Sequence, residues 1–386
     1  MIKTADRLSS VQEYYFSRKL EEIRQMNLAG KDVINLGIGS PDLAPAEEVI
    51  ESLYASASRS DSHGYQSYRS IEEFRVAIAE FYLNHFSVVL DPKTEILPLL
   101  GSKEGVMYIS IAFLNPGDIV LVPNPGYPAY DAVSKMIEAN PVKYDLLEEN
   151  NWAPDLKNID KEILDKAKIM WVNYPNMPTG AAGSKQIFEE LIDFGRQHNI
   201  LICNDNPYSF ILNDQPMSIL EQDEKLENCI ELNSLSKAYN MAGWRVGMVS
   251  GNQEYINAIL KVKSNVDSGM FKPVQEAAIT ALGLSKEWIA ENNVIYGKRK
   301  KLAQELLETI GCQFDQKQVG MFVWATNPKG RDSEEFIDEI LQKANVFVTP
   351  GTIFGTNGEG FVRVSLCATE EKFRESIDRI KKANLS

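Results

Sequence analysis

The segment Asp118-Ile-Val-Leu-Val-Pro123 is a short apolar run that lies between two turn sequences, Asn115-Pro-Gly117 and Asn124-Pro-Gly126. An apolar run of this length with turn residues at both ends is typical of a buried β-strand. The same form recurs in four further segments, at residues 168–174, 200–204, 228–233 and 246–250. The sequence therefore predicts a sheet whose strands are covered on both faces.

Helical periodicity fills several of the intervals between these strands. Apolar residues recur at helical spacing from Ile71 to Phe86, and a second helix is predicted from Glu104 to Leu114. Ser184 is a suitable N-cap for a third helix, which buries residues between 187 and 194. This alternation predicts an α/β fold with a large domain, in which a mainly parallel sheet is flanked by helices.

The pattern changes after about Lys272. A small α+β unit is predicted there from helices at 273–290, 291–310 and 333–343, strands at 319–324, 346–349 and 361–366, and a final helix. We therefore divide the chain into a large domain, residues 45–272, and a smaller domain, which consists of residues 273–386 and an N-terminal arm at 1–44.

Charge and residue usage exclude several functions. The chain has 40 basic and 54 acidic side chains, a net charge of −14. A surface this acidic repels nucleic acid and anionic lipid, so we expect neither as a partner. The scattered cysteines and the absence of a signal-peptide pattern favour a cytoplasmic location without a disulfide scaffold. Only three histidines occur, none in an H-E-x-x-H motif, and we predict no metal site.

Polar and aromatic residues follow the predicted strands. In open α/β sheets the ligand lies at the carboxyl ends of the strands, where these residues meet. Turns alone do not require such a mixture of charge, hydroxyl and ring. The segments concerned are Gly101-Ser-Lys103, Asn124–Tyr127, Asn173–Gly180, Asp205–Tyr208 and Ser234-Leu-Ser-Lys237.

Two of these segments indicate a phosphate next to an amine. The hydroxyls of Ser234 and Ser236 and the guanidinium of Arg245 can bind one phosphate. The backbone N–H groups of Ser102 and Lys103, at the start of a predicted helix, offer a second contact. An amine such as that of Lys237 beside a phosphate pocket indicates a Schiff base with a phosphorylated aldehyde.

The remaining segments supply groups that suit an aromatic cofactor ring. Tyr127 can stack on its face. Asp205 can keep a pyridine nitrogen protonated, so that the ring accepts electrons. Tyr208 can form a hydrogen bond with a ring hydroxyl.

Taken together, these motifs resemble those of fold-type I, class I/II aminotransferases that depend on pyridoxal 5'-phosphate (PLP). The similarity extends over nearly the whole chain and is greatest to the branch that contains the aspartate, alanine and LL-diaminopimelate enzymes. Its most specific part is Ser234-Leu-Ser-Lys-Ala-Tyr-Asn-Met-Ala-Gly-Trp-Arg245. It also includes Ile34–Asp42, Gly64–Tyr68, Gly101–Gly105, Asn124–Pro128, Asn173–Gly180, Asp205–Tyr208 and Phe361–Ser365.

The resemblance implies transfer of the amino group of an L-amino acid to a 2-oxo acid by a ping-pong mechanism. It implies that Lys237, Asp205 and Tyr127 are catalytic, and that Arg363, with the backbone of Gly39, binds the substrate carboxylate. Tyr65 would reach the phosphate of a partner subunit, so the active unit would be a homodimer with active sites at the subunit interface. Apart from the resemblance, Tyr14 near the N-terminus is a candidate to close over the substrate. The cofactor contacts implied are Ser102, Lys103, Tyr127, Asp205, Tyr208, Ser234, Ser236, Lys237, Arg245 and Tyr65.

Two positions depart from the family pattern. Met177 replaces an asparagine that usually bonds the PLP ring hydroxyl. A thioether is only a weak acceptor and has no donor. We expect Tyr208 to hold that oxygen largely alone, rather than with help from Asn176. Ser70 replaces a glycine, which costs little unless the backbone requires a positive φ.

Other functions use parts of the same pattern. A PLP-dependent carbon–sulfur β-lyase or an aminocyclopropane-carboxylate-synthase-like enzyme retains the same cofactor residues. The string Ser234–Lys237 also fits the S-x-x-K motif of penicillin-binding proteins, but the companion strings S-D-N and K-T-G do not occur. A PLP-sensing DNA-binding regulator conflicts with the chain length and its acidity. The choice of substrate stays open, with Lys272 as a weak candidate for a second cation.

Overall fold

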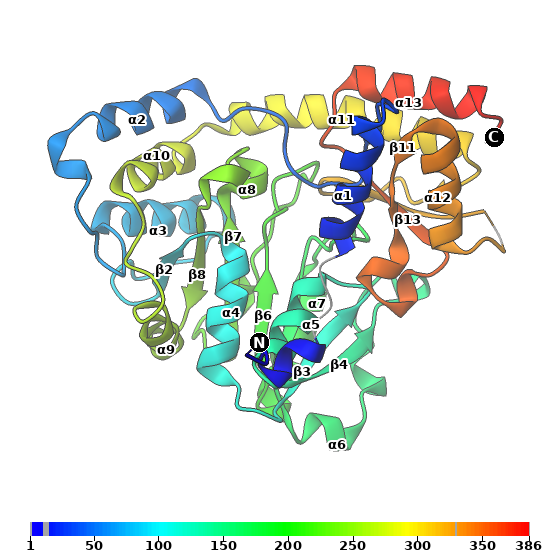
Figure 1. The fold of residues 1–386 in the computed structure, drawn as a ribbon. Helices are drawn as coiled ribbons and strands as arrows, with labels where there is room; N and C mark the ends of the chain where they lie inside the picture. The colour runs from blue at the N-terminus through cyan, green and yellow to red at the C-terminus, as the bar shows by residue number, and fades with distance from the viewer. Residues whose placement is uncertain (1, 11–14, 329, 386) are drawn as a thin grey trace.

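A computed structural model describes residues 2–10, 15–328 and 330–385 of the chain, which fold around a seven-stranded sheet (Figure 1). Five neighbouring strands run parallel, and β8 runs antiparallel to its neighbours β7 and β2. This arrangement confirms the predicted α/β class. In spatial order the strands are β2 (Ile96–Leu99), β8 (Gly247–Gly251), β7 (Cys229–Ser234), β6 (Leu201–Asp205), β5 (Ala167–Val172), β3 (Ile119–Asn124) and β4 (Asn140–Asp145).

Helices cover both faces of this sheet because successive residues of each strand point to opposite sides. In β5, Met170 and Val172 belong to one apolar core, whereas Ile169 and Trp171 belong to the other. The first core includes residues of α2 (Glu47–Ala57), α3 (Glu72–Phe86), α7 (Lys185–His198) and α10 (Lys272–Leu282), and the second includes residues of α4 (Ser102–Phe113), α5 (Pro128–Met136) and α9 (Gln253–Lys263). The short helices α6 (Lys161–Leu164) and α8 (Leu235–Ala238) lie in connections.

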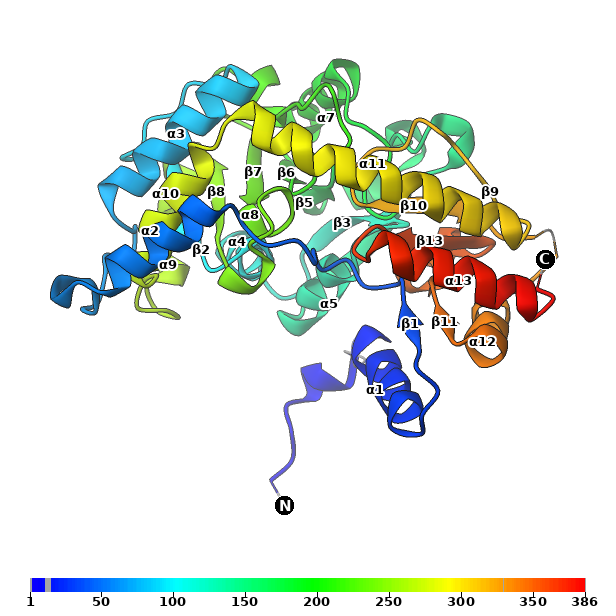
Figure 2. The same cartoon turned by 90° about the horizontal axis from the view of Figure 1, so that it is seen from above.

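The smaller unit has a four-stranded antiparallel sheet of order β12-β13-β10-β9. A separate parallel pair joins β1, near the N-terminus, to β11. The long helix α11 runs from the large sheet across to this unit (Figure 2). The elements are β1 (Ile34–Asn35), α1 (Tyr15–Leu28), α11 (Lys286–Thr309), β9 (Gln313–Phe314), β10 (Phe322–Thr326), α12 (Ser333–Ala344), β11 (Val346–Phe347), β12 (Thr349–Pro350), β13 (Phe361–Ser365) and α13 (Glu370–Lys382).

The prediction of two helices that meet near residue 290 was wrong. The break lies at residues 283–285, between α10 and α11. Gly283 follows the last residue of α10, and the hydroxyl of Ser285 accepts a hydrogen bond from the backbone N–H of Trp288, so it caps α11. Strands β2 and β4 were not predicted. The division at residues 44/45 and 272/273 stays a prediction.

The elements bring the carboxyl ends of the parallel strands to one edge. In the register of β6 and β7, Asp205 lies opposite Leu232, two residues before Ser234. All residues of both strands are buried. Residues 29 positions apart in the chain therefore meet at the edge where a ligand is expected. None of the described helices is long and apolar enough to cross a membrane.

The cap of α7 gives a direct test of how local sequence supports this fold. The Ser184 hydroxyl accepts a hydrogen bond from the N–H of Ile187 at 3.2 Å. Ser184→Ala removes that acceptor and should lower stability by about 1 kcal/mol, which corresponds to a Tm lower by roughly 1–2 °C in differential scanning calorimetry. Ser184→Thr keeps the hydroxyl and should melt like the wild type. Equal melting of all three proteins would contradict a capping role.

Candidate active site

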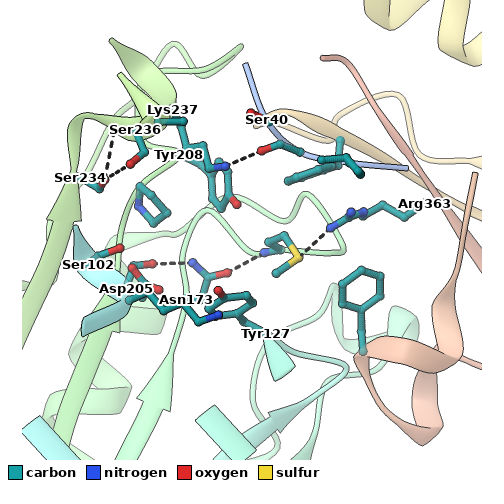
Figure 3. A pocket seen from close by; sticks show the side chains of 18 of the residues that line it. Ser40, Ser102, Tyr127, Asn173, Asp205, Tyr208, Ser234, Ser236, Lys237 and Arg363 are labelled. Carbon is teal, nitrogen blue, oxygen red and sulfur yellow. Dashed lines mark hydrogen bonds between the residues drawn. The ribbon is translucent and has the colours of Figure 1, made fainter. Parts of the chain in front are cut away.

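A cavity of about 610 Å³ lies at the carboxyl edge of the large sheet, between that sheet and the smaller unit. Figure 3 shows side chains from several strands and loops that point into it. Its walls contain most of the residues that the sequence singled out. Those lining it are Gly39, Ser102, Lys103, Tyr127, Asp205, Tyr208, Ser234, Ser236, Lys237, Arg245 and Arg363.

Lys237 projects into the cavity from the short helix α8, which follows β7. Its amine donates a hydrogen bond to the backbone carbonyl of Gly39. Burial lowers the pKa of Lys237, and the positive charges of Arg363 and Arg245 lower it further, against opposing contributions from Cys367 and Asp205. A lowered pKa increases the fraction of neutral amine, which is the form that acts as a nucleophile or base.

Asp205 ends β6 and is 6% exposed. Its Oδ2 accepts a hydrogen bond from the hydroxyl of Tyr130 at 3.0 Å, whereas its buried Oδ1 has no hydrogen-bond partner among the described residues. Burial raises the pKa of Asp205 to about 6, although the bond from Tyr130 and the charge of Lys237 oppose this shift. A carboxyl oxygen that lacks a donor in a cavity is suited to a ligand that brings one.

One side of the cavity is lined by hydrogen-bond donors, among them Ser234 and Ser236, which lie together at the upper left of Figure 3. The hydroxyl of Ser234 donates to that of Ser236 at 2.8 Å and accepts from the backbone N–H of Ser236 at 3.1 Å. Gly101, with φ +89°, lies against the guanidinium of Arg245, so a Cβ at position 101 would collide with it. Ser102 begins α4, whose first N–H groups have no partners within the helix. Hydroxyls, N–H groups and a guanidinium around one hollow suit a phosphate.

Arg363 enters the opposite side of the cavity from β13 and is 3% exposed. Its Nη2 donates to the backbone carbonyl of Gly37 at 2.7 Å. The rings of Phe322 and Phe354 lie 4.0 and 4.7 Å from Cζ, measured to their centroids. The guanidinium is therefore held against aromatic faces, as is favourable for a buried cation. At position 39, a side chain would collide with Phe322, so only glycine fits there.

The loop from Asn173 to Gly180 contains the two residues considered for the ring hydroxyl, and which residue bonds that hydroxyl stays a prediction. Asn176 bonds within the loop, since its Oδ1 accepts from the hydroxyl of Thr179 at 2.8 Å, and it does not line the cavity. Met177 does line the cavity, as does Tyr208. Tyr127 also lies in the wall, where its ring packs edge-on against Tyr130.

Some predicted residues lie elsewhere. Tyr65 is 93% exposed and does not line the cavity of its own chain. Lys272 pairs with Asp61 at 3.2 Å and is also outside the cavity. Ser70 has φ +68°, which is a left-handed backbone conformation. Glycine, the usual residue of the family at this position, adopts that conformation without strain, whereas for serine it costs about 1 kcal/mol. Tyr14 lies outside the described residues.

Sequence reasoning missed several groups in the cavity. Tyr130 was detectable in principle, because it lies one helical turn after Tyr127 in Pro128–Met136. Phe322 and Phe354 gave no local signal, since their contact with Arg363 depends on the packing of separate segments. The Gly37 carbonyl is a backbone group, and its contact with Arg363 could not be predicted from residue type.

The cavity fits PLP by three features of its own chemistry. The donor-rich hollow next to Ser234 and Arg245 matches the phosphate. The amine of Lys237 is available to the aldehyde. The unsatisfied Oδ1 of Asp205 matches a protonated pyridine nitrogen.

Comparison with known proteins agrees with this fit. Residues 31–380 match the model of the family described as aminotransferase class I and II. The LL-diaminopimelate aminotransferases of Aquifex aeolicus and Halothermothrix orenii are 41% and 38% identical, over 100% of this chain and 100% and 99% of theirs. These names favour amino transfer over the lyase alternative.

Solved structures give the same result. Substrate-bound BacF from Bacillus subtilis has a TM-score of 0.95 at 36% identity, covering 100% of this chain and 98% of its own. A single mutant of Thermus thermophilus aspartate aminotransferase has a TM-score of 0.91 at 25% identity, covering 99% of this chain and 100% of its own. The protein therefore belongs to the class I and II aminotransferases, the PLP-dependent enzymes that transfer an amino group from an amino acid to a 2-oxo acid.

Proposed function

We propose that Lys237 binds the cofactor aldehyde and then serves as the base of the reaction. The observation that carries this assignment is the juxtaposition, in one cavity, of a buried amine with lowered pKa and a buried carboxylate oxygen without a donor. When bound, PLP supplies an electron sink for the negative charge that develops at the amino acid Cα. The neutral amine of Lys237 takes the proton from that Cα.

Asp205 is proposed to hold the proton on the pyridine nitrogen. Its Oδ1 offers the acceptor, and the bond from Tyr130 keeps the carboxylate in place. Pairing with a cation lowers a carboxyl pKa, so a protonated ring nitrogen would oppose the shift that burial causes. Tyr127 is proposed to cover the ring face, and Tyr208 to bond the ring hydroxyl.

The two ends of the cavity are assigned to two anions. We propose that Ser102, Lys103, Ser234, Ser236 and Arg245 hold the phosphate. At the other end, Arg363 binds the substrate α-carboxylate through a bidentate pair, supported by the backbone N–H of Gly39. Fixing the carboxylate there orients Cα toward Lys237, and positioning of this kind contributes a large part of enzymatic rate enhancement.

We further propose that the active unit is a homodimer. The exposure of Tyr65, away from the cavity of its own chain, supports a role in the site of a partner subunit. A role for Tyr14 over the substrate is also proposed. All four cysteines lack a disulfide, which supports a cytoplasmic location.

The amino donor is the least constrained part of the proposal. Relatives named LL-diaminopimelate aminotransferase make that diamino dicarboxylate the first donor to assay. A panel of amino donors, with 2-oxoglutarate and with pyruvate as acceptors, tests the whole proposal. Formation of the donor's own 2-oxo acid, matched mole for mole by pyridoxamine phosphate in the absence of an acceptor, supports amino transfer, whereas release of ammonia and pyruvate would support the lyase.

Replacement of Lys237 tests the covalent assignment. Lys237→Ala and Lys237→Arg should lower turnover by at least about 10²–10⁴-fold, because proton transfer at Cα loses its base. In the wild type, borohydride treatment should add the mass of reduced PLP to the tryptic peptide that contains residue 237. Labelling of another lysine, such as Lys103, would contradict the assignment.

Replacement of Asp205 gives a pH-dependent test in the PLP-free protein. The folded-state pKa of about 6 exceeds the ordinary 3.8, so ionisation destabilises the folded state, and stability is lost as the pH rises from about 4 through 6. Asp205→Asn avoids this cost and should be more stable than the wild type at pH 8, by about 1–3 kcal/mol, but not at pH 4. Calorimetric Tm values at both pH values measure the difference.

A matched control is available for that experiment. Asp193 is 80% exposed, so Asp193→Asn should show no comparable gain at pH 8. A lower Tm of PLP-free Asp205→Asn at pH 8 would contradict the argument from burial.

Mixed dimers test the proposed role of Tyr65. Lys237→Ala and Tyr65→Ala should each be impaired alone, whereas their co-expressed heterodimer regains one site with both wild-type residues. Activity of the purified heterodimer should approach half that of the wild type if Tyr65 acts across the interface. Tyr54→Ala, at a residue that is 77% exposed, is the control for loss of an exposed tyrosine, and by itself it should keep wild-type activity. Absence of complementation would place Tyr65 outside the partner's site.

A further inference from the structure

Met177 lies next to Arg363 at the substrate end of the cavity. Nη1 of Arg363 donates a hydrogen bond to Sδ of Met177 at 3.2 Å, and the dashed line from Arg363 in Figure 3 ends on this sulfur. Met177 is 5% exposed and lines the same cavity. The sulfur is thus in contact with the group that is proposed to bind the substrate carboxylate.

The contact adds to the in-plane support of a buried cation. A guanidinium has five N–H donors, and burying it is costly unless acceptors surround it. Gly37 accepts from Nη2 and Met177 accepts from Nη1, so two different nitrogens are fixed. Phe322 and Phe354 contact the guanidinium through their ring faces. Rotation within the plane is limited by the acceptors, and tilting is limited by the rings.

Met177 is itself anchored to the cofactor end of the site. Its backbone N–H donates to Oδ1 of Asn173 at 2.8 Å, and the amide of Asn173 donates to the backbone carbonyl of Asp205. Contacts therefore run without interruption from Asp205 through Asn173 and Met177 to Arg363. A shift of the loop at 173–177 would move the sulfur relative to Arg363.

We propose that Met177 is a positioning residue for Arg363. Its thioether orients the guanidinium for the substrate carboxylate and does not act on the ring hydroxyl of the cofactor. A thioether has no N–H donor, so it accepts from Arg363 without binding the carboxylate itself. The inference rests on the proposed role of Arg363 and extends it to the residue that replaces the family's asparagine.

Carboxylates that lack an amino group test this proposal without turnover. We choose 3-phenylpropionate and glutarate, a monocarboxylate and a dicarboxylate, and measure Kd by isothermal titration calorimetry on the PLP-loaded protein. Met177→Leu keeps an apolar side chain but removes the acceptor, and should raise both Kd values by about 3- to 10-fold. The pH midpoint of the visible absorption of bound PLP should stay at its wild-type value.

Two further variants serve as controls for side-chain replacement. Met170→Leu makes the same change at a fully buried methionine of β5 that does not line the cavity, and should leave both Kd values within twofold of the wild type. Met177→Gln offers Arg363 an oxygen acceptor at a similar distance along the side chain. Among folded proteins, it should bind both carboxylates more tightly than Met177→Leu, and a Kd near the wild-type value would support the role of the acceptor independently of the leucine variant.

The outcomes distinguish the proposed role of Met177 from the proposed role of Arg363. Wild-type Kd values in Met177→Leu, or a shifted absorption midpoint with unchanged Kd values, would overturn the role of Met177. Arg363→Leu tests the proposed clamp independently. Unchanged carboxylate binding in that variant would reject the clamp itself, whereas a large loss in Arg363→Leu with no loss in Met177→Leu rejects only the positioning role.

Discussion

The site depends on the burial of an amine and a carboxylate in one cavity. Lys237 and Asp205 both lie where their charged forms are disfavoured. Burial lowers the pKa of Lys237 and raises that of Asp205, so each shift favours the neutral form. Neither shift would arise on the surface, where water solvates the charge. The sheet makes this burial possible, because the strands before both residues are covered on both faces. Burial of these two groups lowers the stability of the folded protein, and it leaves both groups in a form that can react or pair with a ligand.

The substrate end of the cavity depends on contacts between distant parts of the chain. The segment from Gly37 to Asp42 lies close to both ends of the site, since Gly39 accepts from Lys237 and Gly37 accepts from Arg363. Arg299 of α11 holds this segment through a two-point ion pair with Asp42, at 2.6 and 2.8 Å. A largely buried pair of this kind resists displacement, because separation would leave a buried charge without its partner. The N-terminal segment therefore acts as a connection between the two sides of the site.

Departures from a family pattern acquire a physical meaning once their surroundings are known. Ser70 occupies a left-handed backbone position, so its cost is conformational. Met177 faces a guanidinium, so its effect concerns hydrogen bonding to a cation. From sequence, Met177 was judged only by what the cofactor would lose. The structure adds a neighbour that no spacing in the chain indicates.

Local sequence was sufficient for the class of fold and for the polar residues at the strand ends, whereas Gly39 and Arg363 were indicated only by the family resemblance. Apolar runs and turn residues predicted the strands, because burial and chain reversal act on neighbouring residues. The carboxyl ends of those strands then indicated where Lys237, Asp205 and Ser234 would meet. The predicted break between α10 and α11 was misplaced, because helical periodicity continues across Gly283–Ser285. The hydrogen bond that the Ser285 side chain accepts is what shows where α11 begins. Only the tertiary structure decided the contacts of Tyr130, Phe322, Phe354 and Met177. These contacts join segments that are far apart in the chain, so they depend on how the layers of the fold pack together. No short sequence pattern specifies that packing.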